Sequence, residues 1–209
     1  TLAQSETQIL ALNQEAAVDA IVHFEQGEKL TVETIIVKTN AAPLVFGGGN
    51  GFGAIDATGD TMTIDTMDSN SVASVRAAIA LTPEKTLLKL GAGRLVLPDD
   101  FSWGGKLDIV EGMVTCTNTS GIVPSVRLYG SGTFEVAGDA SRTFSQAQPD
   151  FSGRLAFAGG VNTVADATAI GVSQSHSAKI TTSVQVKEGA EMHIADPDGL
   201  GGRILVAGG

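Results

Sequence analysis

Short stretches of alternating apolar and polar residues, separated by glycine-rich turns, run along most of this chain. The segment 87–114, LLKLGAGRLVLPDDFSWGGKLDIVEGMV, contains three short apolar runs and three glycine turns. Alternation with a period of two predicts strands that bury one face. The predicted inward positions are Leu88, Leu90, Leu95, Leu97, Leu107 and Ile109. The predicted outward positions are Lys89, Arg94, Val96, Lys106 and Asp108.

This arrangement of turn and strand is repeated along the chain. The segments PDDFSWGGKLDI, PDFSGRLAF and PDGLGGRILV each combine Pro-Asp with a glycine, a basic residue and an apolar strand. Their aligned glycines, Gly105, Gly153 and Gly202, are separated by 48 (153 − 105) and 49 (202 − 153) residues. A strand, a glycine turn and another strand precede each copy. Stacked repeats of this kind can bury one continuous core, which favours a β-solenoid.

We therefore predict an all-β fold, a single parallel β-helix (β-solenoid) domain spanning 1–209, with about 20–25 residues in each coil. A β-sandwich is the alternative. The segment 5–21 has the Ser5 and Gln8 of a capping box, so either a short N-terminal capping helix or a first coil is expected there. The later segment SVASVRAAIAL is predicted to be a strand because it leads directly into the strand at Leu87.

Composition and charge restrict the classes of partner that this chain is expected to bind. The chain has 26 glycines among 209 residues and a net charge of −10, with no basic stripe. Such a chain repels phosphate backbones and anionic lipids, so neither nucleic acid nor membrane insertion of this segment is expected. The only cysteine, Cys116, allows no intramolecular disulfide and is expected to be a buried small side chain. The start at Thr1 favours a fragment of a larger secreted protein.

Candidate metal and catalytic residues have simpler structural interpretations. GGNGFGAID (48–56) resembles a calcium-binding nonapeptide, but Gly53 replaces the aspartate ligand, so a glycine corner without metal is predicted. Aspartates in Pro-Asp turns would bond to their own backbone. They are Asp99, Asp100, Asp150, Asp196 and Asp198. The three histidines, His23, His176 and His193, are far apart in sequence, so no catalytic residues and no cofactor are predicted.

Aromatic residues in turns are the candidate ligand contacts. Trp103, Phe101, Phe144 and Phe151 lie outside the alternating strands, where they could stack on sugar rings or anchor a protein partner. Trp103, Phe101 and Phe151 are the predicted contact residues. In the alternative interpretation, these rings fold over the corners and seal the core.

The segment AIALTPEKTLLKLGAGRLVLPDDFSWGGKLDIVEGMV resembles the passenger-associated β-strand repeat of autotransporters. The matching residues are Leu87, Lys89, Gly91, Gly93, Leu95, Leu97, Gly104, Gly105, Gly112 and Val114. The sequence departs from the family pattern where Asp100-Phe101-Ser102-Trp103 replaces an Asn-Thr-Tyr turn and where Val114 replaces a leucine. The full motif covers about 30 residues, and weaker copies extend across about two-thirds of the chain.

The resemblance implies a right-handed parallel β-helix from the surface-exposed passenger of a secreted bacterial protein. In that family the repeat is a folding and display scaffold, without catalytic residues to transfer. The expected function is therefore non-enzymatic: a stalk, scaffold or adhesin at the bacterial cell surface and outer membrane. The expected partners are host glycan or matrix protein, or a second copy through the solenoid ends. The alternative is a carbohydrate-active enzyme that uses the turn aspartates.

Overall fold

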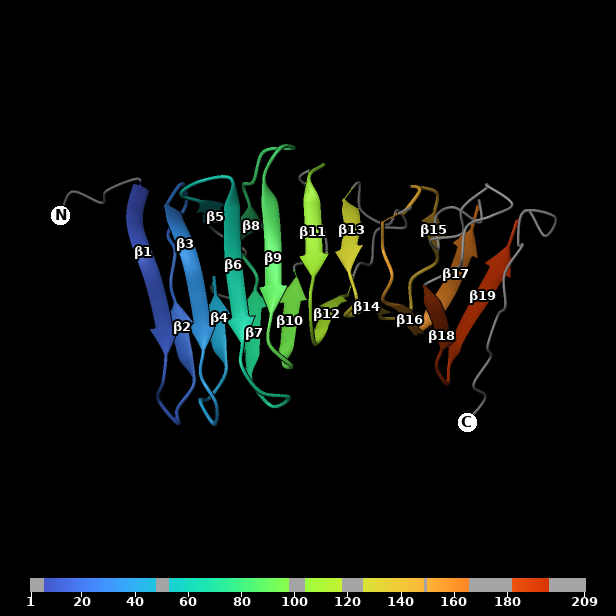
Figure 1. Cartoon of the computed structure of the whole chain (residues 1–209), viewed down its shortest axis with the longest axis horizontal. Coiled ribbons are helices and arrows are strands. Elements are labelled where there is room, and N and C mark those ends of the chain that lie inside the picture. Colours follow the sequence, from blue (N-terminus) through green and yellow to red (C-terminus); the bar gives the residue numbers. More distant parts are fainter. Residues whose placement is uncertain are drawn as a thin grey trace.

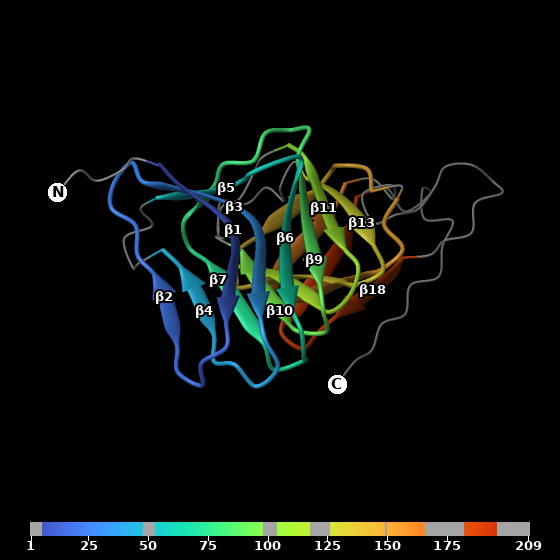
Figure 2. The same cartoon turned by 60° about the vertical axis from the view of Figure 1, so that its left-hand side comes forward.

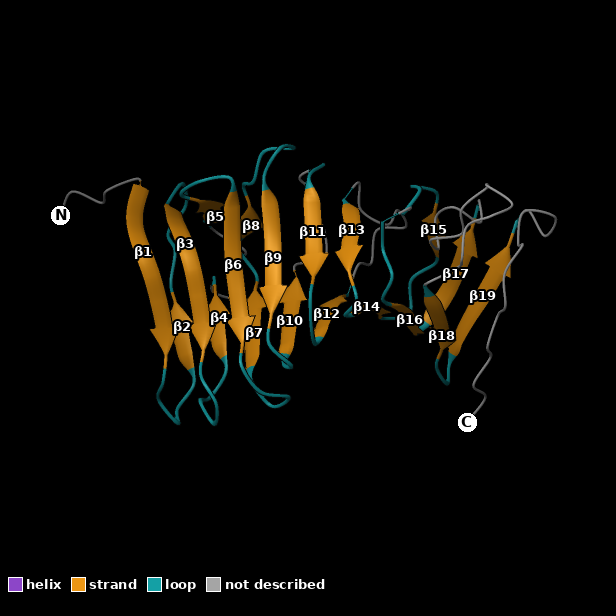
Figure 3. Cartoon of the chain, viewed as in Figure 1, coloured by secondary structure: helices purple, strands orange, loops and turns teal. Residues whose placement is uncertain are grey.

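The protein is an all-β rod. The computed structural model describes residues 6–47, 53–97, 104–117, 126–148, 150–165 and 182–195. These residues form strands joined by turns and loops, and no helix occurs among them (Figure 3). That part of the chain consequently has no helix able to cross a membrane. The strands succeed one another along the rod, from β1 at one end to β19 at the other (Figure 1).

Three parallel sheets run along the rod. Sheet A has eight strands: β1 (Glu6–Gln14), β3 (Lys29–Val37), β5 (Ala54–Ala57), β6 (Thr61–Thr66), β8 (Ala78–Ile79), β9 (Thr86–Leu90), β11 (Lys106–Ile109) and β13 (Arg127–Gly130). Sheet B has eight: β2 (Ala20–Val22), β4 (Leu44–Phe46), β7 (Val72–Val75), β10 (Arg94–Leu97), β12 (Met113–Cys116), β14 (Thr133–Ala137), β16 (Arg154–Ala158) and β18 (Ser183–Val186). Sheet C has three: β15 (Arg142–Phe144), β17 (Gly160–Val164) and β19 (Ala190–Ile194).

The pairing confirms the predicted β-solenoid. Every strand pair among the described residues is parallel, and chain segments from successive coils lie side by side (Figure 2). Paired residues are 19 positions apart between Arg94 and Met113, and 30 apart between Gly160 and Ala190. Parallel neighbours require a long return connection, whereas a β-sandwich is built mainly from antiparallel strands. The sandwich alternative is therefore excluded.

The long strand β3 turns a corner of the solenoid and keeps the same register with β1 on both sides of that corner. Its first part buries Leu30 and Val32, and its second part buries Ile35 and Val37. At the exposed Glu33 the alternation of inward and outward side chains shifts by one residue. The two parts pair with different strands, since 29–32 lie beside β5 and 34–37 lie beside β6. Sheet A therefore covers two sides of the coil at this end of the rod.

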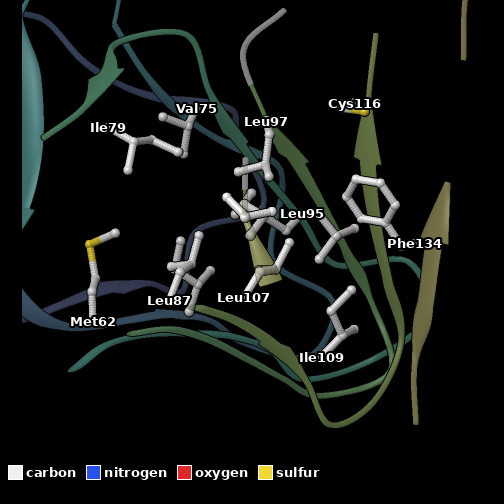
Figure 4. Packing of buried hydrophobic residues seen from close by; sticks show 14 of the residues in the cluster. Met62, Val75, Ile79, Leu87, Leu95, Leu97, Leu107, Ile109, Cys116 and Phe134 are labelled. Atoms are coloured by element: carbon white, nitrogen blue, oxygen red, sulfur yellow. The ribbon is translucent and has the colours of Figure 1, made fainter. Parts of the chain in front are cut away.

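The core consists of ladders of aliphatic side chains, one from each coil. Met62, Leu87, Leu107 and Leu128 are paired in register on four successive strands of sheet A and are all buried. Leu95, Val114, Phe134 and Leu155 form the facing ladder on sheet B. Side chains from the two sheets meet in the interior (Figure 4). Burying each of these side chains stabilises the fold by about 1.5–3 kcal/mol.

The predicted inward positions on β10 and β11 are correct, and those on β9 are wrong. Leu95, Leu97, Leu107 and Ile109 are fully buried, as predicted. On β9, however, Leu87 and Lys89 face the core, and Leu88 and Leu90 lie half-buried on the outer face. Leucines occupy both faces of TLLKL, so hydrophobicity alone could not determine the phase. The register with Met62 and Leu107 determines it instead.

The 48-residue repeat does not correspond to a structural period. Gly105 precedes β11 in sheet A, whereas Gly153 precedes β16 in sheet B, and Gly202 lies outside the described residues. Lys106 instead pairs with Arg127, which is 21 residues further on (127 − 106). The similarity of the two Pro-Asp segments reflects two similar corners at different places in the coil. The structural repeat is a single coil.

Of the two alternatives for the segment 5–21, the first coil is confirmed, and no helix forms in its described residues. Within 5–21, the residues 6–14 form β1, which pairs with β3 at eight positions, and Gln8 is part of that ladder. Ser5 lies outside the described residues. A parallel ladder with the next coil satisfies the backbone groups that a helix would have satisfied internally. The strand predicted for SVASVRAAIAL is confirmed, since it contains β7 and β8.

Candidate functional site

The described aromatic candidates are part of the core. Phe151 is 1% exposed and Phe144 is 5% exposed. Phe144 packs edge-to-face against Phe157, with ring centroids 4.9 Å apart and planes at 68°. A ring that is enclosed in this way has no face free for a ligand, so Phe151 fits the core-sealing alternative and not the predicted contact. Phe101 and Trp103 lie outside the described residues.

The turn aspartates do not gather into a site where the structure describes them. Asp150 is exposed in its turn, and Asp99, Asp100, Asp196 and Asp198 lie outside the described residues. Asp68 plays the backbone-bonding role that was predicted for turn aspartates. Its carboxylate accepts hydrogen bonds from the N–H groups of Asn40 (2.9 Å), Asn70 (2.8 Å) and Ser71 (2.9 Å). These bonds, led by that of Asn40, hold the pKa of Asp68 below its usual value.

The segment that resembles a calcium-binding nonapeptide (48–56) and the histidines likewise do not come together in the described part of the chain. Residues 48–52 lie outside the described residues, and Asp56, at the end of that segment, forms ion pairs with lysines. His23 is exposed after β2, whereas His193 is on β19 near the other end of the rod and contacts Glu191 at 3.1 Å. His176 lies outside the described residues. The described part of the chain holds no group of three metal-binding side chains.

Cys116 occupies the position predicted for it. The side chain is fully buried on β12, in a ladder with Leu97 and Val136. It therefore serves as a small apolar side chain in the core.

An alternating row of charges links successive coils on the outside of sheet A. Lys29 Nζ lies 3.0 Å from Glu6 Oε1 and 3.7 Å from Asp56 Oδ2, and Lys85 Nζ lies 2.9 Å from Asp56 Oδ1. The hydrogen bond with Lys29 is the largest cause of the lowered pKa of Glu6, and that with Glu6 raises the pKa of Lys29. We call these four residues the charge ladder. It favours the observed register, since a slip of one coil would pair like charges.

Lys89 is the largest departure from the sequence-based expectation. It occupies the interior ladder position that isoleucine holds on both neighbouring strands, as Ile64 and Ile109, and it is fully buried. Its ammonium donates hydrogen bonds to the carbonyl oxygens of Leu90 (2.6 Å) and Gly91 (2.6 Å). A third bond reaches the carbonyl of Glu111 on the next coil, at 3.3 Å.

Burial governs the protonation of this lysine. Loss of solvent lowers the pKa of Lys89 to about 8, and the carboxylates of Asp65 and Glu111 oppose that shift. The three carbonyls lie where the chain turns from sheet A to sheet B. A carbonyl that points inward there has no N–H group of a neighbouring strand from which to accept a hydrogen bond. Lys89 therefore supplies donors to the corners of two successive coils, which is a structural role for a buried cation.

Gln14 serves another corner in the same way. Its side-chain amide donates to the carbonyls of Val18 (2.9 Å) and Ala42 (3.2 Å), and thereby joins the corners of the first and second coils. Gln14 is 5% exposed at the end of β1. A long polar side chain at the inner end of a strand was not predicted from the sequence. Gln14 and Lys89 share one sequence feature, which is a polar residue near the end of a strand, just before the chain turns toward the next strand.

Arg142 plays this role between sheets B and C. It is 1% exposed, and its guanidinium donates to the carbonyls of Ala137, Gly138 (3.0 Å) and Gly159 (3.4 Å). Asn162, its neighbour in the ladder, is fully buried and donates to Gly159 at 3.0 Å. We refer to Gln14, Lys89, Arg142 and Asn162 as the corner clamps. Their donors are taken up by backbone carbonyls, so their chemistry is that of holding coils together.

The two terminal coils leave part of the core uncovered. The apolar residues that contact the core but are only partly buried all belong to the first coil (residues 6–28) or to the last described coil (residues 182–195). They are Ile9, Leu12, Ala20, Val22, Phe24, Val184, Val186, Ala190 and Met192. Between these coils the interior ladder residues are fully enclosed. The described rod thus has an apolar column that reaches both of its ends.

Comparisons with protein-family models, with curated proteins and with solved structures found no match.

Proposed function

We propose that this β-solenoid is a non-enzymatic structural segment of a secreted, surface-displayed bacterial protein, in which it serves as a stalk or scaffold. The observation that carries the proposal is the apolar column that reaches the two terminal coils. A column of this kind can be extended by further coils, because each coil contacts only its neighbours. The resemblance to the passenger-associated repeat of autotransporters supports the same role.

The use of the charged side chains also supports a structural role. The charge ladder joins coils on the outside, and the corner clamps join them inside. Glu135, which is 5% exposed on β14, forms an ion pair with Lys187, the residue after β18, and accepts a hydrogen bond from Thr115 on β12 at 3.2 Å. These side chains are therefore engaged in holding neighbouring coils in register.

An adhesive role would add contact with host glycan or matrix protein through Trp103 and Phe101. The test is binding of the purified protein to arrays of glycans and matrix proteins, with Trp103→Ala and, as a control, Tyr129→Ala on sheet A. For an adhesin we expect a specific signal that Trp103→Ala abolishes and Tyr129→Ala preserves. A signal that both variants retain would contradict contact through Trp103.

The enzyme alternative is tested on a panel of acidic and neutral polysaccharides. The assay measures release of reducing ends and the ultraviolet absorbance of unsaturated uronates. A stalk or scaffold leaves every polysaccharide intact. Turnover that is lost in Asp100→Asn or Asp150→Asn would overturn the structural role and would assign the activity to the turn aspartates.

A further inference from the structure

Two exposed cations lie side by side on the outer face of sheet A, near the middle of the rod. Lys106 on β11 and Arg127 on β13 are paired in register. Neither of them forms an ion pair within the described part of the chain. The Lys106 ammonium lies over the ring of Tyr129, 5.6 Å from its centroid, and this contact uses none of its hydrogen-bond donors on a carboxylate. Both charged groups are therefore accessible to an anion.

This pair departs from the charge pattern elsewhere on the sheet. Neighbouring parallel strands are about 4.8 Å apart, and like charges that face each other at this spacing repel. The charge ladder, by contrast, alternates lysine and carboxylate from one coil to the next. A like-charge pair that costs stability, in a chain with 23 acidic and 13 basic residues, indicates a function that requires the two cations together.

Two hydroxyl groups continue this row along the rod. Thr61 on β6 pairs with Thr86 on β9, which pairs with Lys106. Strands β6, β9, β11 and β13 lie side by side in that order (Figure 1). We call Thr61, Thr86, Lys106 and Arg127 the outer column. Its members come from four successive coils, point outward and are half-buried or exposed. The column offers hydroxyls at one end and cations at the other.

Acidic residues at the border of the outer column indicate how a ligand is oriented. The exposed Asp60 directly precedes Thr61, so an anionic group is disfavoured at that end. Asp108 is half-buried on β11, beside Tyr129 in the adjacent column, and forms no ion pair with Lys106 or Arg127. A ligand of this surface should therefore place its anionic groups at the two cations and its neutral hydroxyls at the threonines.

We propose that the outer column binds an acidic polysaccharide that lies along the rod, with the carboxylates of two successive uronate residues beside Lys106 and Arg127. The coil spacing of about 4.8 Å is close to the length of one sugar residue in an extended polysaccharide, so each sugar meets one coil. Charge-assisted hydrogen bonds to the two cations hold the carboxylates. The hydroxyls of the preceding sugars lie at Thr86 and Thr61. This binding goes beyond the stalk or scaffold role and depends neither on it nor on contact through Trp103.

The probe is a fluorescently labelled oligogalacturonate, and its control is the same oligosaccharide after reduction of the carboxyl groups. Anisotropy is measured at physiological ionic strength, because screening beyond about 8 Å suppresses the long-range repulsion by the net charge of −10 and preserves direct contacts. We expect saturable binding that is about fivefold or more weaker for the reduced oligosaccharide. Absence of binding, or equal affinity for the two oligosaccharides, would overturn the proposal.

Nuclear magnetic resonance titration of the isotope-labelled protein locates the oligogalacturonate. We expect the amide shifts of β6, β9, β11 and β13 to change together, with the largest changes at Lys106 and Arg127. Shift changes confined to sheet B or sheet C would place the ligand elsewhere and would refute the outer column.

Matched double variants separate a specific pair of cations from general attraction. We expect Lys106→Gln, Arg127→Gln to lower the affinity for oligogalacturonate about threefold or more. The control, Arg94→Gln, Arg154→Gln, removes two exposed cations from one column of sheet B, where they are three coils apart, and should leave the affinity unchanged. Both double variants change the net charge equally, and circular dichroism verifies that both are folded. Equal losses in the two would overturn the proposal.

Trp103→Ala distinguishes this site from the adhesive contact. We expect this variant to bind oligogalacturonate as the wild type does. Binding that Trp103→Ala abolishes and that Lys106→Gln, Arg127→Gln retains would assign the polysaccharide to the adhesive contact and would refute the outer column. The failure of either site is thus recognised independently of the other.

Discussion

Replacing Lys89 by methionine tests the role of the buried cation. Methionine has a similar length and fills the same ladder position between Ile64 and Ile109, but it cannot donate to the corner carbonyls. The variant therefore removes both the cost of a buried charge and the three hydrogen bonds. Because these two effects differ in their pH dependence, the difference in stability between the two proteins should change with pH.

The sign and size of the change follow from the pKa. The pKa of Lys89 is about 8 in the folded protein and has the ordinary value of 10.5 in the unfolded chain. Between these pH values the unfolded chain binds more protons, so the wild type gains stability as the pH rises. From pH 7 to pH 10 the gain from this residue is about 2.5 kcal/mol. Below pH 8 the cost of burial is fully present, and it offsets much of what the three hydrogen bonds contribute.

The assay is urea unfolding of the wild type and of Lys89→Met, monitored by circular dichroism at several pH values from 7 to 10. We expect similar stabilities near pH 7 and a variant that is about 2–3 kcal/mol less stable than the wild type at pH 10. The difference between the two proteins cancels every contribution that they share. A difference that stays constant within about 0.5 kcal/mol over this range would refute the burial of the ammonium.

Three further predictions concern other positions of the solenoid. Thr66 is fully buried and its hydroxyl has no hydrogen-bond partner, so Thr66→Val should raise the free energy of unfolding by about 1 kcal/mol in urea titrations; a loss of stability would contradict this. Gly112 has φ +72°, and a Cβ there would lie 2.4 Å from the carbonyl oxygen of Gly93, so Gly112→Ala should cost about 3 kcal/mol or more. Gly27→Ala, with φ +84° and open space around it, is the control and should cost about 1 kcal/mol in the same titrations; equal costs would refute the steric argument. The lowered pKa of Asp68 means that its carboxylate stabilises the fold above the usual pKa of 3.8 and loses this effect as the pH falls through the lowered value. Asp68→Asn should therefore lower the melting temperature at neutral pH, and the gap to the wild type should close in acid; a gap that persists there would contradict the assignment.

The sequence was sufficient to predict the class of fold because each coil repeats the same few requirements. The strand KLDI has apolar residues on one face alone, and a glycine turn follows it. The phase of β9 could not be predicted, since Leu87 and Leu88 are equally apolar and the register with the neighbouring coils decides between them. Lys89 is predicted to lie on the surface because the local sequence does not reveal that its ammonium donates to corner carbonyls, one of which belongs to Glu111, 22 residues away.

Less of the candidate site than of the fold could be predicted from the sequence. Turn aromatics have the same local pattern whether the ring folds inward or outward. Phe151 is buried at a corner where its backbone contacts Gly130 of the preceding coil and Thr182 of the following coil. The charge ladder was not predicted either. Its members Glu6, Lys29 and Asp56 are separated by 23 (29 − 6) and 27 (56 − 29) residues, and coil lengths vary too much for such a spacing to be inferred before the register is known.

The parallel pairing of neighbouring coils has a consequence for folding kinetics. Paired positions among the described residues are separated by 19 to 30 residues, so the loop that each added coil closes varies in length by less than twofold. The entropy of loop closure depends on the logarithm of loop length and is therefore almost constant from one coil to the next. Folding can then proceed by growth from an existing coil, whose free strand edge templates the next strand. An incompletely folded molecule is in that case a shorter solenoid with the same kind of growing end.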